Sequence, residues 1–131
     1  MLTLLAAALS LTVQTSEFTH DSEALSQYMV QACQVQQVSR NGATEEENLP
    51  FCTCLDREIA NNTTDEIYRI FAIGSQGAIG EYARIDAAMA QAESQRIFAE
   101  LPADVQATAQ PILQSAVGNC MAEAPVTVSA Q

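Results

Sequence analysis

Apolar residues recur along this chain three or four positions apart, and no stretch alternates in the manner of a β-strand. The first apolar stripe consists of Leu25, Tyr28, Met29, Ala32 and Val35. It predicts a helix whose N-terminal cap lies among Thr19, Asp21 and Ser22. The helix is expected to end at residues 40–42, because Asn41 or Gly42 suits the left-handed conformation common after a helix.

A second helix is predicted to begin at Pro50, because the missing N–H of proline costs little in a first turn. Its apolar face would be Phe51, Leu55 and Ile59, and it would stop at Asn61 and Asn62. Thr63 and Glu66 have the spacing of a capping box, which predicts a third helix through Ile67, Ile70, Phe71 and Ile73. The glycines at 74, 77 and 80 are expected to end that helix and form a tight turn.

Two more helices are predicted in the C-terminal half. An alanine-rich helix should run from Glu81 to Leu101 and end before Pro102. The last helix has one apolar stripe, formed by Val105, Ala109, Ile112, Ala116 and Cys120. Pro111 should kink this helix or split it in two. The complete pattern predicts an all-α fold, a compact bundle of about four to five helices.

The chain begins with an uninterrupted run of apolar and small residues from Leu2 to Val13. This run is too short to span a bilayer and matches the apolar segment of a signal peptide. We therefore predict a signal peptide over residues 1–15, a helical domain over 16–124 and a flexible tail over 125–131. The alternative is an apolar N-terminal helix packed on the core. An exported protein, periplasmic or secreted, could keep disulfides.

The charge balance is strongly acidic, with 16 Asp and Glu against five Arg and no Lys, for a net charge of −11. Such a chain is unsuited to binding nucleic acid or anionic lipid, both of which need cationic side chains. One interpretation is a basic protein partner, and the alternative is that the acidic residues serve only to solvate the surface. Glu45, Glu46 and Glu47 fall in a predicted polar loop, which we interpret as an acidic surface facing that partner. The alternative is a first helical turn, where the helix dipole favours carboxylates.

The four cysteines are Cys33, Cys52, Cys54 and Cys120. Residues two apart on a helix point about 200° away from each other, so Cys52 and Cys54 cannot bond together. Each should instead be bonded to Cys33 or Cys120, which gives two disulfides that cross-link three helices. We favour Cys33–Cys54 with Cys52–Cys120, because Cys33 and Cys54 would lie at similar heights above a 41–48 loop. The reverse pairing stays open.

Other roles for the cysteines are less well supported. Structural zinc sites have C-x2-C pairs, which are absent here, so no metal site and no cofactor is predicted. A redox pair remains an alternative, because both cysteines fall in a predicted first turn. However, the neighbouring Asp56 and Glu58 oppose formation of a thiolate.

The segment Phe51-Cys52-Thr53-Cys54, with one cysteine upstream and another near the C-terminus, resembles a loose group of small, uncharacterised exported bacterial proteins. The likeness covers the cysteine spacing and the helical pattern of roughly residues 20–123. It implies a helical, disulfide-bonded exported protein and no particular activity.

No catalytic set is recognisable in the sequence, and the only histidine, His20, is interpreted as a residue at a helix start. We therefore predict a non-enzymatic binding protein: an adaptor, an inhibitor or immunity-type protein, or an accessory subunit. The first alternative is a carrier of an apolar small molecule, with Met29, Met89 and Met121 lining its cavity. The second is a protein that handles thiols and disulfides or a metal. No stable membrane span is predicted.

Overall fold

Helices account for nearly all of the chain that the computed structural model describes, residues 21–80 and 86–126. They are α1 (Ser22–Asn41), α2 (Glu45–Asn62), α3 (Asp65–Ala78), α5 (Ala87–Glu100), α6 (Ala103–Gln106), α7 (Ala109–Cys120) and the 3-10 turn η1 (Met121–Glu123). The predicted all-α bundle is confirmed, with five longer helices and two disulfides in the described ranges.

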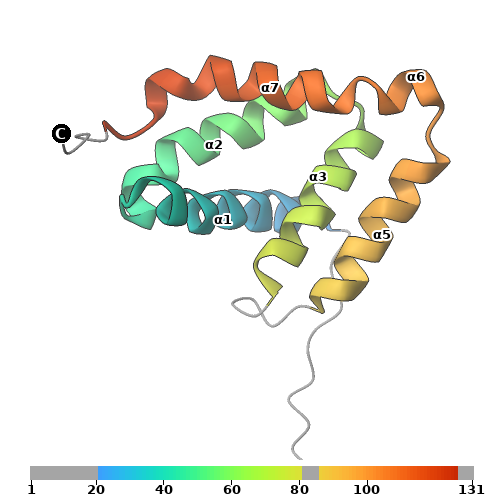
Figure 1. The fold of residues 1–131 in the computed structure, drawn as a ribbon, viewed down its shortest axis with the longest axis horizontal. Coiled ribbons are helices and arrows are strands. Elements are labelled where there is room, and N and C mark those ends of the chain that lie inside the picture. The colour runs from blue at the N-terminus through green and yellow to red at the C-terminus, as the bar shows by residue number, and fades with distance from the viewer. Residues whose placement is uncertain (1–20, 81–85, 127–131) are drawn as a thin grey trace, which may run out of the picture.

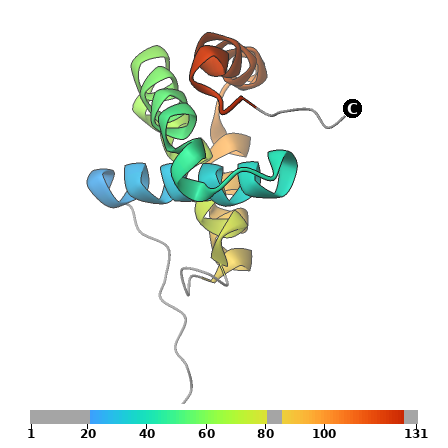
Figure 2. The same ribbon diagram turned by 90° about the vertical axis from the view of Figure 1, so that its left-hand side faces the viewer.

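The five longer helices pack in a chain of neighbours. Helix α1 contacts α2 and α3, α3 lies along α5, and α7 lies along α2 (Figure 1). Figure 2 shows α2 and α7 on the same side of α1, with α3 and α5 crossing it. The predicted signal peptide and His20 lie outside the described residues, as does most of the predicted tail.

The connection between α1 and α2 is shorter than the sequence pattern indicated. Gly42 ends α1 in the left-handed conformation, with φ of 72°, as predicted. Helix α2 then begins at Glu45 rather than at Pro50. The Thr44 hydroxyl accepts a hydrogen bond from the Glu47 amide at 3.1 Å, and the Glu47 carboxylate accepts one from the Thr44 amide at 3.3 Å. This capping box starts the helix five residues before Pro50.

The early start of α2 corrects the prediction that Glu45, Glu46 and Glu47 belong to a loop and confirms the alternative, since they form the first helical turn. Carboxylates are favoured there by the helix dipole. Pro50 instead lies inside the helix, where it removes a single backbone hydrogen bond.

The capping box predicted for α3 is wrong by one residue. Thr64 is the N-cap, and its hydroxyl accepts a hydrogen bond from the Ile67 amide, whereas the Thr63 hydroxyl donates to the Ile59 carbonyl of α2. Gly74 and Gly77 do not end α3, which continues to Ala78. They let α5 approach: a Cβ atom on Gly77 would lie 2.7 Å from the Gln91 side chain.

The split in the last predicted helix is confirmed. Helix α6 ends at Gln106 and α7 begins at Ala109, which places Pro111 in the first turn of α7. In a continuous helix the proline ring would clash with the carbonyl of Ala107, four residues before it, and the break falls at this point.

The core consists of two apolar clusters. The first joins all five longer helices and contains Leu25, Met29, Ile59, Ala72, Ile73, Ala90 and Ala116. The second surrounds the disulfides and contains Phe51 with the four cysteines.

The disulfides are Cys33–Cys52 and Cys54–Cys120, so the pairing that we favoured, Cys33–Cys54 with Cys52–Cys120, is wrong. The prediction that Cys52 and Cys54 bond to different helices is confirmed. The cause of the error is the rotation of α2 about its axis. The predicted pairing was based on height along the helices, whereas the rotation of α2 places the Cys52 side chain toward α1.

Hydrogen bonds along α2 show why Cys52 faces α1. Cys52 lies four residues after Asn48 and four before Asp56, and residues four apart share a helix face. Asn48 is bonded to Asn41 of α1, and Asp56 to Ser26 of α1.

Cys54 lies on a different face of α2. Glu58, four residues later, accepts a hydrogen bond from Asn119 of α7, next to Cys120. The disulfide pairing thus follows from which face of α2 each cysteine lies on: Cys52 on the face toward α1, and Cys54 on the face toward α7.

Candidate functional site

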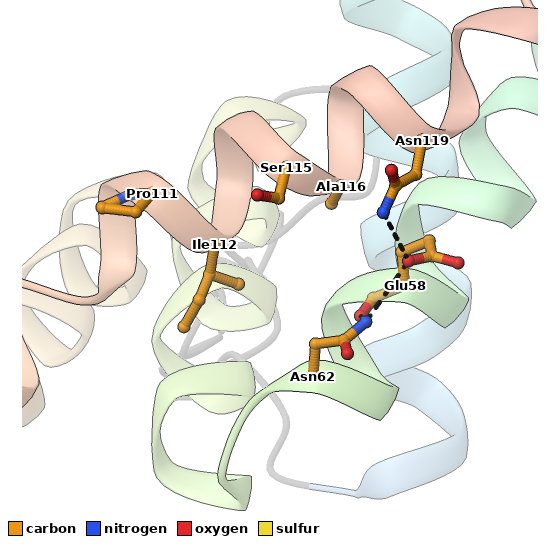
Figure 3. A pocket seen from close by; sticks show the side chains of 7 residues that line it. All are labelled: Glu58, Asn62, Pro111, Ile112, Ser115, Ala116 and Asn119. Carbon is orange, nitrogen blue, oxygen red and sulfur yellow. Dashed lines mark hydrogen bonds between the residues drawn. The ribbon is translucent and has the colours of Figure 1, made fainter.

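A cleft of about 320 Å³ separates the C-terminal half of α2 from α7 (Figure 3). We call it the α2–α7 cleft. Its polar lining consists of Glu58, Asn62, Ser115 and Asn119, and its apolar lining of Pro111, Ile112 and Ala116. The Nδ2 atoms of Asn62 and Asn119 each lie 3.3 Å from Oε2 of Glu58. The cleft therefore presents one half-buried carboxylate between two amides.

The Cys54–Cys120 disulfide holds the two walls of this cleft together. Cys54 is one helical turn before Glu58, and Cys120 follows Asn119 directly. The Cα atoms of the two cysteines lie 5.7 Å apart. Because the carboxylate and the amide lie beside a covalent link, their spacing is fixed before any ligand arrives.

A second acidic feature is the first turn of α2, Glu45–Glu47, which we call the acidic turn. All three residues are exposed. Gln34 of α1 donates a hydrogen bond to the Glu45 carbonyl, and the capping box holds Glu47. The structure positions these predicted residues together, although it does not test whether they face a partner. Two ion pairs among the described side chains lie elsewhere, between Arg96 and its α5 neighbours Glu93 and Glu100.

A third feature is an apolar cavity of about 270 Å³ among α1, α2, α3 and α7. Its buried lining includes Met29, Cys33, Phe51 and Ile59. Leu55, Phe71, Leu113 and Val117 are half-buried members of the wall. Gln36, Gln37, Arg40 and Ser75 complete the lining.

The three methionines proposed to line a cavity do not converge. Met29 lines the apolar cavity, but the side chains of Met89 and Met121 are 45% and 57% exposed and line none of the clefts described here. That part of the carrier hypothesis is wrong, because helical spacing identifies a face of each helix and cannot tell which faces meet.

Asp56 is the centre of a hydrogen-bond network that joins three helices. Its carboxylate accepts bonds of 2.6 Å from the Ser26 hydroxyl of α1 and from the Tyr68 hydroxyl of α3. Burial first, then the hydrogen bond to Asp56 and the charge of that carboxylate, raise the pKa of the Tyr68 phenol above its usual range. A phenol kept neutral in this way is a poor base. With no imidazole among the described side chains, the network ties helices together and does not resemble a nucleophilic site.

The described residues contain no group of three His, Cys, Asp or Glu side chains placed to hold a metal ion. None of the helices in this part of the chain is both long and apolar enough to cross a membrane. The disulfides are consistent with an oxidising compartment.

Comparison of the chain with protein-family models, curated protein sequences and solved structures found no match. What is established is a small helical protein with two disulfides. That the protein is exported, and that it is related to small exported bacterial proteins, therefore stay predictions.

Sequence reasoning missed Glu58, Asn62 and Asn119. A local signal for Glu58 did exist, because it lies one helical turn after Cys54, and a cysteine bonded to another helix marks the face that meets that helix. Asn119 stands beside the other cysteine. These positions could be combined only once the disulfide pairing was known.

Proposed function

We propose that this protein is an exported, non-enzymatic binding protein that recognises a cationic partner, with Glu58 in the α2–α7 cleft receiving a basic side chain. The observation that carries the proposal is the placement of the Glu58 carboxylate in a cleft whose walls are covalently linked. A guanidinium or ammonium group could bind this carboxylate and the amide carbonyls of Asn62 and Asn119. Such a cleft suits an adaptor, an inhibitor or an accessory subunit.

The acidic turn and the net charge of −11 support a different part of the same function. Exposed carboxylates contribute little affinity individually, but together they speed the approach of a cationic partner. The helix dipole also favours glutamates at this place, so their position serves the fold as well. In this proposal the acidic turn speeds association of the partner, and Glu58 slows its dissociation.

The test compares two substitutions that change the net charge equally. The probe is a short arginine-rich peptide, and its neutral citrulline counterpart is the ligand control. Glu58→Gln should weaken arginine-peptide binding by about tenfold or more, mainly through faster dissociation. Glu66→Gln, on an exposed first-turn residue of α3 outside the cleft, should have only a small effect. Equal losses for the two variants would show that the peptide senses only the overall charge.

The acidic turn is tested by changing Glu45 and Glu46 to glutamine while keeping Glu47, because Glu47 belongs to the capping box. Association of the arginine peptide should slow and become less sensitive to salt, while dissociation should change little. An unchanged association rate at low salt would remove the acidic turn from the proposal.

A further inference from the structure

The apolar cavity differs in charge from three other clefts in the described part of the molecule. Each of these three is lined by at least one acidic residue: Glu58 in the α2–α7 cleft, Asp56 and Asp65 in a cleft beside Tyr68, and Asp104 in a cleft beside Ile67. The lining of the apolar cavity includes no Asp or Glu, and its one charged member is Arg40. Arg40 therefore makes the lining of this cavity locally positive, although the whole chain is strongly acidic.

Arg40 is available to a ligand. It lies in the last turn of α1, is exposed, and makes no ion pair or hydrogen bond with the other described residues. The positive charge of Arg40 interacts favourably with the helix dipole at the C-terminal end of α1. That interaction leaves the hydrogen-bond donors of its guanidinium group unused. Gln36 and Gln37 line the cavity from the same helix and add amide donors.

The buried side of the cavity suits an aliphatic chain. Met29, Phe51 and Ile59 are at most 5% exposed, and no charged group lies among them in the lining. An apolar cavity of about 150 Å³ is enough to hold benzene. At about 270 Å³, this cavity has room for a longer apolar group.

We propose that the apolar cavity binds an aliphatic carboxylate, such as a medium-chain fatty acid, with its chain against Met29, Phe51 and Ile59 and its carboxylate on Arg40. A guanidinium binds a carboxylate through two parallel hydrogen bonds, which gives the site a preference for this head group. The site is separate from the α2–α7 cleft and does not depend on the proposed cationic partner.

The sign of the ligand charge makes the proposal testable. The field of the whole protein attracts cations, so non-specific binding would favour a cationic amphiphile. A preference for an anion must come from Arg40. Calorimetric titration of the full-length oxidised protein, below micelle-forming concentrations, would compare decanoate, decanol and decyltrimethylammonium. Decanoate should bind one to one and about tenfold more tightly than either of the other two.

Two outcomes of this titration would overturn the proposal. Tighter binding of the cationic amphiphile would show that the overall field decides. Absence of binding by all three would show that the cavity is closed, or is filled by another segment of the chain or by a second copy.

Three variants locate the binding. Arg40→Gln should weaken decanoate about tenfold and leave decanol unchanged. Arg57→Gln removes an exposed arginine outside the cavity and should alter neither. Ser75→Leu should fill the cavity and weaken both ligands while the protein stays folded, because Ser75 lines the cavity and is only half-buried. Equal effects of the two arginine variants, or unchanged binding by the Ser75 variant, would refute the assignment.

Discussion

Asp56 accepts a hydrogen bond at each carboxylate oxygen, from Ser26 on α1 and from Tyr68 on α3. One side chain of α2 thereby fixes two neighbouring helices. A carboxylate withdrawn partly from water needs such partners, because an unsatisfied buried charge costs several kcal/mol. Asp56 thus helps to set how α1 and α3 are placed against α2.

Removing the Tyr68 hydroxyl tests this network through its pH dependence. The folded-state pKa of Tyr68 is raised, so its stabilising contribution is complete below about pH 10 and is lost as the pH rises toward the folded value. The free energy of unfolding should therefore fall as the pH rises above about 10 in the wild type, and less steeply in Tyr68→Phe. At neutral pH the variant should lose about 1.5 kcal/mol.

Denaturant titrations at several pH values provide the measurement. Tyr28→Phe is the matched control, because Tyr28 is a half-buried phenol that is not bonded to Asp56. Identical alkaline slopes for the wild type and Tyr68→Phe would contradict the role given to the Tyr68–Asp56 bond.

At the scale of the element, glycine has opposite roles at two helix positions. Gly42 ends α1 with φ of 72°, a conformation that other residues adopt at a cost. Gly118 lies within α7, is exposed, and has nothing within 4 Å of a built Cβ atom. The first glycine is required by the turn, whereas the second weakens its helix.

Alanine substitutions should separate these two roles. Gly118→Ala should stabilise the protein by about 0.8 kcal/mol, because alanine is the better helix former and meets no neighbour. Gly42→Ala should destabilise it by about 1–2 kcal/mol, because the left-handed backbone is strained with a Cβ atom. Thermal and urea unfolding of both variants would measure the difference. Destabilisation by Gly118→Ala would mean that α7 has a neighbour at this face.

The same elements show how far the sequence determines the fold. Apolar stripes, the end of α1 at Gly42 and the break before Pro111 are local, so they could be predicted. The start of α2 was predicted from Pro50, whereas the Thr44–Glu47 capping box, an equally local signal that the prediction overlooked, sets it. The role of Gly74 and Gly77 could not be predicted from the neighbouring sequence, because they allow α5, a helix later in the chain, to pack closely against α3.

The disulfide pairing and the site lay beyond local reasoning for a geometric reason. Cys33 lies eight residues before the end of α1, and Cys52 and Cys54 lie seven and nine residues after the start of α2. Height along the helices therefore does not determine whether Cys52 or Cys54 bonds to Cys33. The rotation of α2 about its axis determines it. The α2–α7 cleft and the apolar cavity likewise depend on how several helices meet. No sequence pattern marks Arg40, and the position of Glu58 one turn after Cys54 becomes informative only once the disulfide pairing is known.

At the scale of the whole molecule, the two disulfides should contribute unequally to stability. They span 19 and 66 residues, and loop-closure entropy predicts about 3 kcal/mol for Cys33–Cys52 and about 4 kcal/mol for Cys54–Cys120. The longer ring also holds α7 on α2, its main neighbour among the described helices. We therefore expect the double serine variant at 54 and 120 to lower the urea midpoint more than the variant at 33 and 52.

Peptide mapping of the non-reduced wild type must accompany that comparison. Cleavage at arginine leaves Cys52 and Cys54 on one peptide, residues 41–57, so a further cut between them is needed to assign the pairs. A larger loss from removing the shorter ring would contradict the entropic ranking.

The disulfides also decide which parts of the chain can bear tension. They close two consecutive rings, residues 33–52 and 54–120, which are joined through Thr53 alone. A pull on the two ends of the oxidised chain would pass across both sulfur bridges. Helices α3, α5 and α6, which lie wholly inside the longer ring, would stay outside the path of the force. Stretching single molecules should therefore release the length of these helices only after a reductant is added.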